Sequence, residues 1–338
     1  METVGEEDRV HKNLTTQFPR MVAACVLPVA MIAQAWGADI YPAKPIRLLV
    51  GFPPAGANDL VARVVAARLG ARLNQQVVVE NRPGAGGNIA TELVARAPAD
   101  GHTMLLGSVS ALGMSPALYG QVPFDPVNDF APVTQLVGIS ALLVAHPTVP
   151  VASLKEFVAL AKKYPGKLNI GTPGTGSIAH LTAELFMKMV GVKLVHVPYK
   201  GGGPAVIDVL SGQIECLMSL ISTGAPHIKS GRLRGLGLSS LKRSPILPEV
   251  PTIAESGYSG FEASGWLGLL FPAKTPEAIV ERMHRETIAV MNLPDVRAQL
   301  ESNGIDPAPS NPQAFRAYIK SELAKWSKLI KDAGLRAN

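Results

Sequence analysis

The sequence predicts an α/β protein with two lobes, a two-strand hinge between them and a ligand cleft where the lobes meet. From Pro45 onward, a unit of short β-branched strand, Gly/Pro/Ser-rich turn and amphipathic helix recurs in two series, which meet near Pro150. Two extended stretches with glycine and aromatic residues, 132–146 and 261–272, lie between the series or after them. Such alternation is typical of a parallel sheet with helices on both faces.

The first series predicts three strands, at 46–50, 77–80 and 103–106, and helices at 60–73 and 89–97. The second predicts strands at 167–171, 194–197 and 214–218, and helices at 154–163, 178–190 and one ending at Leu210. Two further helices, 276–291 and 312–333, are expected to pack back on the first lobe.

We interpret 132–146 and 261–272 as two hinge crossings. Residues 40–143 with 266–338 then form lobe 1, and residues 144–265 form lobe 2. Two independent domains on one linker are less well supported, because no long polar linker interrupts the chain.

Residues 1–35 are predicted to be a signal peptide that is cleaved after Ala35. Lys12 and Arg20 precede an apolar run from Met21, which ends in the small-x-small sequence Ala33-Gln34-Ala35. The long, partly acidic stretch before Arg20 favours a translation start downstream of Met1. Export to the periplasm is therefore expected.

Cysteine usage excludes an intramolecular disulfide in the exported chain. Cys25 stands at the start of the apolar run, which argues against lipidation there, and only Cys216 would remain. Cys216 lies in an apolar stretch and reads as a core thiol.

Charge gives weak guidance about partners. Removing three basic and four acidic side chains with residues 1–35 leaves 29 basic and 22 acidic, a net +7. This excess favours anionic solutes, but no dense basic cluster with aromatics indicates nucleic acid.

Three Gly-rich turns are candidate ligand loops. They are 52–59, 172–177 and 199–203, each between a predicted strand and a predicted helix. Ligands of open α/β sheets bind at the carboxyl ends of strands, where the amides of a helix start favour anions. Each turn alone is equally well explained as an ordinary strand-to-helix connection. Asp59 reads better as a helix cap or lobe-fixing group than as an anion contact.

Cofactor, metal and catalytic motifs are weak. The sequence from Gly174 to Ala179 fits a dinucleotide fingerprint, but the next strand supplies no acidic residue for a ribose, and no P-loop lysine follows the glycines. His180 and Glu184 share a helix face, which a polar pair explains better than a metal site. There is no G-x-S-x-G elbow. We expect no cofactor, no metal and no catalytic residues.

Motifs along the chain resemble the Bug-type solute-binding proteins of tripartite tricarboxylate transporters. The matching stretches are GFPPAGANDLVAR at 51–63, ENRPGAGGNIA at 80–90, SPALY at 115–119, GTPGTGSIAHL at 171–181, VPYKGGGPA at 197–205 and LPEVPTIAESG at 247–257. One departure is Ala55-Gly56, where the family often has two glycines.

The resemblance implies a type II-like periplasmic binding protein that closes about its hinge on an organic carboxylate, held by backbone amides, hydroxyls and waters. Carried over by position, the candidate ligand-binding residues are Phe52, Pro54, Ala55, Gly56, Ala57, Asn58, Asp59, Ser108, Ser110, Thr172, Gly174, Thr175, Gly176, Ser177, His180, Tyr199, Gly201 and Trp266.

The expected function is a monomeric periplasmic receptor that delivers its carboxylate to the large and small integral-membrane subunits of such a transporter. Two alternatives stay open. One is a sensory binding protein of the same fold that signals to a membrane kinase, and the other is an exported hydrolase, which Ser177→Ala would inactivate. The sequence does not identify the carboxylate.

Overall fold

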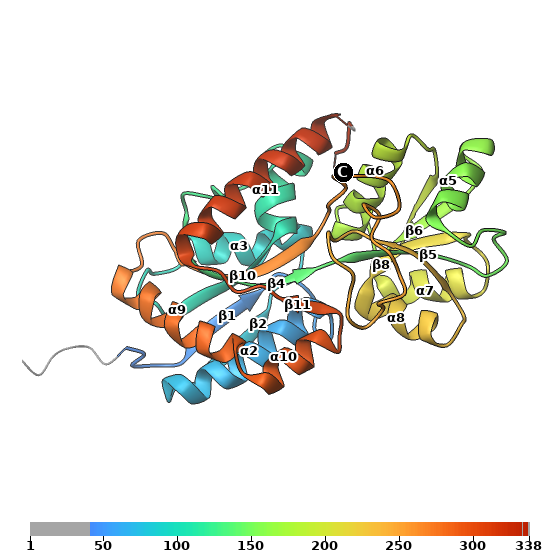
Figure 1. Ribbon diagram of the computed structural model, residues 1–338. Helices are drawn as coiled ribbons and strands as arrows, with labels where there is room; N and C mark the ends of the chain where they lie inside the picture. Colours follow the sequence, from blue (N-terminus) through green and yellow to red (C-terminus); the bar gives the residue numbers. More distant parts are fainter. Residues whose placement is uncertain (1–40, 333, 337–338) are drawn as a thin grey trace, which may run out of the picture. The chain divides into compact units, whose positions relative to one another are not determined.

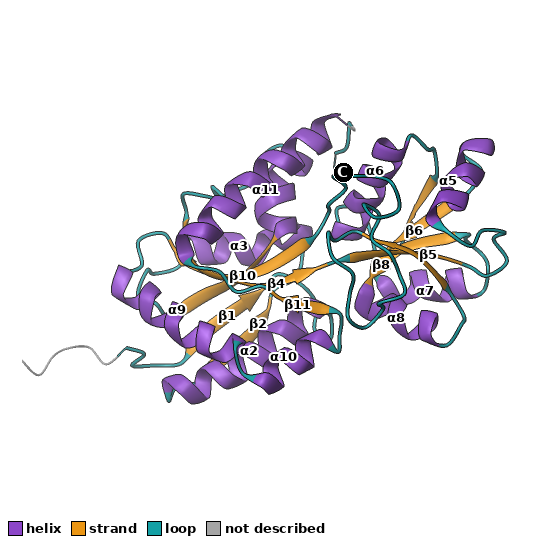
Figure 2. Cartoon of the chain, viewed as in Figure 1, coloured by secondary structure: helices purple, strands orange, loops and turns teal. Residues whose placement is uncertain are grey.

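The computed structural model describes residues 41–332 and 334–336, and one compact unit begins at Lys44. Figure 1 traces the chain and Figure 2 shows its helices and strands in the same view. The predicted signal peptide and Cys25 lie outside the described residues. No helix in the described part of the chain combines the length and apolar character needed to cross a bilayer.

The first sheet has six strands in the order β11-β4-β10-β3-β1-β2. Their bounds are β1 Ile46–Val50, β2 Val77–Asn81, β3 Thr103–Ser108, β4 Phe130–Ile139, β10 Gly265–Pro272 and β11 Ile305–Pro307. In Figure 1, one side of this sheet is covered by α2 Ala57–Leu73, α9 Glu277–Met291 and α10 Pro294–Glu301. The other side carries α3 Asn88–Ala95 and α11 Pro312–Asp332, with the short turns η1 Ala85–Gly87, η2 Ser110–Met114 and α4 Ser115–Tyr119.

The second sheet has five strands in the order β7-β6-β8-β5-β9. They are β5 Ala141–Ala145, β6 Asn169–Thr172, β7 Val195–Pro198, β8 Cys216–Leu220 and β9 Arg234–Leu238. The helices α5 Leu154–Lys163 and α6 Ile178–Val190 lie on one side, and α7 Gly202–Leu210 and α8 Ile221–Lys229 lie on the other (Figure 1).

Both sheets are mixed, whereas the strand–helix alternation predicts parallel ones. The pairs β1–β2, β1–β3, β6–β7 and β6–β8 are parallel, but β10 runs antiparallel to β3 and β4, and β5 runs antiparallel to β8 and β9. The antiparallel strands belong to the stretches that pass from one sheet to the other. These strands join their sheets without a crossover helix. Parallel pairing of consecutive strands would require such a connection.

The passage between the sheets is short on one side. β4 ends at Ile139 in the first sheet and β5 begins at Ala141 in the second, so residues 141–143, assigned to lobe 1 from the sequence, pair in the second sheet. The return passage enters β10, which pairs with β4 along its length from Gly265 opposite Ile139. The predicted two-strand hinge therefore exists as adjacent antiparallel strands.

Aromatic packing against β10 explains why position 268 of this strand is a glycine. The ring of Phe315 on α11 lies at right angles to that of Trp266, with ring centroids 5.3 Å apart. A Cβ at Gly268 would lie 2.2 Å from Cζ of Phe315. Only glycine fits there, because protein interiors leave no room for an added methyl at that distance.

Candidate functional site

A cleft of about 460 Å³ is formed by loops at the ends of strands from both sheets. Its volume suits a small metabolite. It is lined by Phe52, Pro53, Pro54, Gly56, Ala57, Asn58, Ser108, Val109, Ser110, Ile139, Pro173, Ser177, Ile178, Ala179, Lys200, Gly201, Gly202, Leu220, Gly265, Trp266 and Leu267.

Four helices begin at this cleft. Their N-cap residues, Gly56 of α2, Ser177 of α6, Gly201 of α7 and Leu220 of α8, all line it. The N–H groups in the first turn of a helix have no acceptor within that helix, and the helix dipole adds partial positive charge. The sequence predicts three loops that lead into helices of this kind, and the structure brings four helix starts together. The site therefore favours negative charge.

The charged side chains agree with this preference. Lys200 is the one charged residue among those that line the cleft in the described chain, and no aspartate or glutamate lines it. The other polar groups at the wall include the hydroxyls of Ser108, Ser110 and Ser177. Phe52 and Trp266 supply apolar surface. A small anion with an apolar body matches these groups.

The first loop, 52–59, is held by Asp59 from outside the cleft. The carboxylate of Asp59 accepts hydrogen bonds from the Ala55 amide at 3.0 Å, from Nε of Arg63 at 2.9 Å and from Nδ2 of Asn81 at 3.0 Å. The Arg63 guanidinium lowers the pKa of this carboxyl, and burial opposes it. Asp59 thus holds the loop in place and does not line the cleft, which agrees with its interpretation as a fixing group rather than an anion contact.

Ala55 adopts an unfavourable backbone conformation. Its φ is +64°, a left-handed value that favours glycine. We expect Ala55→Gly to raise the free energy of unfolding by about 0.5 kcal/mol, since relief of strain exceeds the added entropy of the unfolded chain.

Urea unfolding would measure this change, with Ala57→Gly as control. Ala57 is helical, so that replacement should lower stability instead. A loss of stability in Ala55→Gly would contradict the strain argument.

The predicted site residues divide into two groups. Ten line the cleft: Phe52, Pro54, Gly56, Ala57, Asn58, Ser108, Ser110, Ser177, Gly201 and Trp266. Eight do not: Ala55, Asp59, Thr172, Gly174, Thr175, Gly176, His180 and Tyr199. The hydroxyl of Tyr199 donates to Asp208 at 2.8 Å, and burial and this carboxylate raise the pKa of Tyr199 to about 12.

The prediction missed several lining residues. Lys200 was passed over although it lies in the turn already singled out. Gly202 also lies in that turn, 199–203. Leu220 stands at the turn from β8 to α8, a helix that the sequence analysis did not predict. Pro53 and Pro173 lie in the predicted loops 52–59 and 172–177 but were not among the eighteen residues. The residues outside all three predicted loops are mostly apolar: Val109, Ile139, Ile178, Ala179, Gly265 and Leu267.

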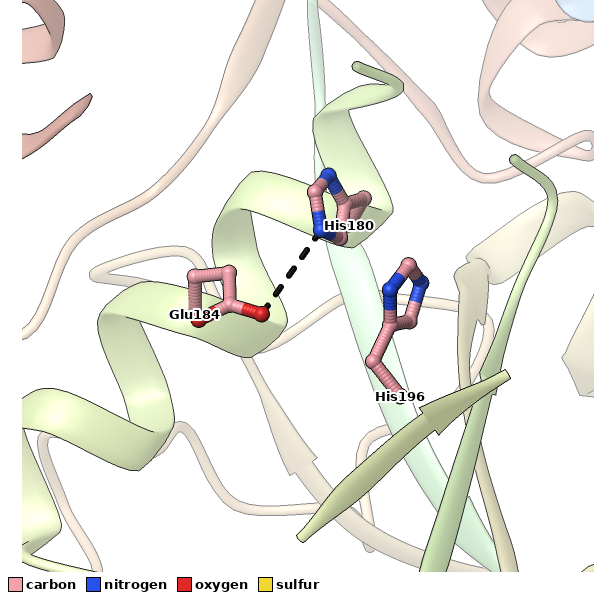
Figure 3. A group of neighbouring side chains, drawn as sticks. All are labelled: His180, Glu184 and His196. Carbon is pink, nitrogen blue, oxygen red and sulfur yellow. Dashed lines mark ion pairs between the residues drawn. The ribbon is translucent and has the colours of Figure 1, made fainter. Parts of the chain in front are cut away.

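Behind the second loop, two histidine rings stack beside a glutamate (Figure 3). The centroids of His180 and His196 are 4.2 Å apart with 21° between the planes, and Nε2 of His180 lies 3.6 Å from Oε1 of Glu184. Each residue offers one ligand atom within 4.8 Å of the others, which is close enough for a metal ion.

The hydrogen bonds disfavour a metal at this cluster. The Gly176 amide donates to Nδ1 of His180 at 3.2 Å, so a neutral ring carries its proton on Nε2, the atom that faces Glu184. Metal-bound histidines instead donate from the nitrogen that does not hold the metal. The rings are also stacked, so their lone pairs run side by side rather than converging.

Comparison with known proteins identifies the family. Residues 61–335 match the tripartite tricarboxylate transporter family receptor, TctC. The chain belongs to this family. It is 36% identical over 316 residues to the protein BugT of Bordetella pertussis, a match covering 93% of this chain and 97% of BugT. The resemblance to Bug-type proteins is thereby confirmed.

Two solved structures show what related chains bind. Rpa4515 of R. palustris with adipate is 33% identical, with a TM-score of 0.79, over 88% of this chain and 99% of that one. MatC (Rpa3494) of Rhodopseudomonas palustris with bound malate is 30% identical, with a TM-score of 0.75, over 86% of this chain and all (100%) of that one. The fold is that of a periplasmic binding protein.

Proposed function

We propose that this TctC-family receptor binds a small organic carboxylate in the cleft and delivers it, in the periplasm, to the large and small membrane subunits of a tripartite transporter. The observation that carries the proposal is the set of four helix N-termini at a cleft whose lining, in the part of the chain that the structure describes, has one lysine and no acidic side chain. Adipate and malate in related structures support the same ligand class.

The residues we assign to the ligand are those that both line the cleft and offer a donor. The amides after Gly56, Ser177 and Gly201 would share one carboxylate, because they belong to helix starts of both sheets. Lys200 and the serine hydroxyls would meet further oxygens of the ligand. Phe52 and Trp266 would cover its carbon chain.

Binding without chemistry is the better interpretation of Ser177. Its Oγ accepts the backbone N–H of His180 at 3.2 Å, and no histidine ring is hydrogen-bonded to it among the described residues. A serine nucleophile needs such a base. Ser177 therefore serves as a helix cap, and we expect no turnover of esters or amides for Ser177→Ala to abolish.

A thermal-shift panel tests the ligand class. Mono-, di- and tricarboxylates, aromatic acids, amino acids and neutral sugars would be added to the purified protein. A ligand that binds only the folded state at 100 times its Kd stabilises it by about 2.7 kcal/mol. Stabilisation by carboxylates alone supports the proposal, and stabilisation by sugars alone would refute it.

We also expect the bound carboxylate to bring the two lobes together. It contacts loops of both sheets, and a ligand shifts a hinge equilibrium through contacts made in one state only. Small-angle scattering should show a smaller radius of gyration when a carboxylate found in the panel is added. An unchanged radius at saturation would contradict closure.

A further inference from the structure

We propose that the stacked rings of His180 and His196 position the loop 173–177 for anion binding, and that a proton on His180 releases this loop. The two rings lie behind the loop and outside the cleft, so they act through backbone contacts. The effect on affinity rests on the proposed function, whereas the effect on the loop does not.

The loop depends on few hydrogen bonds. Gly174 and Gly176 have φ of +146° and +77°, and the Ser177 amide donates to the Gly174 carbonyl at 3.2 Å. The Gly176 amide donates to Nδ1 of His180 at 3.2 Å. That bond fixes the residue immediately before the N-cap of α6. Losing it frees the start of α6, one of the four helix origins at the cleft.

The loop 173–177 also holds the start of α7 in place. The Gly201 amide donates to the carbonyl of Pro173 at 2.8 Å, and both residues line the cleft. Gly201 follows Lys200 and caps α7. A displacement of the loop 173–177 would therefore also move the lysine and a second helix origin.

The proton controls the bond through the chemistry of the ring. Nδ1 of His180 accepts the Gly176 N–H only while it carries no proton. In the imidazolium both nitrogens are donors, so Nδ1–H and the Gly176 N–H would face each other. The Nε2–H of the charged ring would also be attracted more strongly to the carboxylate of Glu184, 3.6 Å away. This attraction favours the state in which the Gly176 amide is released.

His196 anchors the stacked pair of histidine rings to β6. Its Nε2 is hydrogen-bonded to Oγ1 of Thr172 at 2.7 Å, at the residue where β6 enters the loop. Burial lowers the pKa of His196 to about 4, with a further contribution from His180 that Glu184 opposes. His196 thus stays neutral through the weakly acid range.

Few other titratable groups belong to the elements packed on α6. Of the strands β5, β6 and β8, only β8 carries one, Cys216, whose thiol stays neutral because burial raises its pKa. β7 contributes His196. In the segment before β10, which bonds Thr182 of α6 through Ala263, Glu262 is paired with Lys325 at 2.6 Å. On α11, Asp332 is paired with Lys188 of α6 at 3.3 Å. Glu184, on α6 itself, is therefore the anionic neighbour that the proton on His180 would meet.

Hydrogen exchange of the ligand-free protein tests the release of the loop directly. Peptides covering 173–181 would be followed at pH 7.5 and pH 5, each corrected with an unstructured peptide of the same sequence. In the wild type we expect protection to fall about tenfold at pH 5, the size of one lost hydrogen bond. His180→Asn offers an oxygen to the Gly176 amide without titrating, so its protection should be equal at both pH values.

His180→Leu is the complementary variant, since it fills the site without an acceptor. Its loop should be unprotected at both pH values, while peptides of α11 remain protected. Equal protection of the wild type at both pH values, or the same loss in His180→Asn, would overturn the proposal. A rise in the melting temperature of the wild type but not of His180→Asn on adding Zn²⁺ would also overturn it, by assigning the cluster to a metal.

Titrations with adipate and with malate extend the test to affinity. For whichever acid binds, we expect the wild type to lose about tenfold more affinity between pH 7.5 and pH 5 than His180→Asn, a comparison that cancels the titration of the acid itself. Equal losses would overturn the coupling to binding. If neither acid binds, the proposed ligand class is in question, and the exchange experiment alone decides the positioning of the loop.

Discussion

Replacing Lys200 by glutamate is expected to weaken carboxylate binding by more than 100-fold. The substitution removes the one cation that lines the cleft among residues 41–332 and 334–336, and it places a carboxylate beside the ligand. Each of these two changes should cost about 1.5 kcal/mol, because hydrogen bonds to charged groups contribute about that much and two carboxylates in contact repel each other. Lys200→Gln removes only the cation and should cost about tenfold.

Isothermal titration with a carboxylate from the panel would measure both losses. Lys193→Glu is the matched control, because it makes the same change of charge on an exposed residue that precedes β7 and does not line the cleft. Its affinity should stay within about twofold of the wild type, since exposed charges at a distance are screened by salt. An undiminished affinity in Lys200→Glu would remove Lys200 from the site.

The elements with local signals were predictable from the sequence. The predicted helix 178–190 is α6 as observed, and Ser177 caps it with its side chain. The predicted helix 154–163 likewise begins after the capping Ser153. The helix α8 was missed, because its sequence ISTGAPHIK has a glycine and an internal proline. Its position is set by packing against β5 and β8.

The candidate site was predictable as loops but not as side chains. The rule that ligands meet strand ends selected the correct turns, because it depends on topology alone. It could not tell Tyr199 from Lys200. One of these neighbours bonds to Asp208 and the other lines the cleft. Leu220 and Ile139 come together only through the pairing of β5 with β8 and of β4 with β10, which no local pattern encodes.

The stability of the ligand-free protein should fall as the pH drops from about 6.5 toward 4, because of His196. The pKa of His196 is about 4 in the folded protein, against an ordinary value of 6.5. Between these values the unfolded chain binds a proton that the folded one refuses, so acid favours unfolding. From pH 7.5 to pH 5 the expected loss is about 1 to 2 kcal/mol, reduced from the full linkage value because the ring is only partly buried.

Urea unfolding at the two pH values would isolate this contribution in the variant His196→Gln. Glutamine can still hydrogen-bond Thr172 but does not titrate, so its loss of stability between pH 7.5 and 5 should be smaller by that amount. His227→Gln is the control, because His227 lies on α8, away from the stacked pair, and its pKa is lowered less, by burial and Arg232. The carboxyl of Glu80, whose pKa is about 2, affects stability mainly below pH 4.5. Equal losses in the wild type and His196→Gln would mean that His196 takes up its proton equally in the folded and unfolded chains, and that burial does not keep this ring neutral.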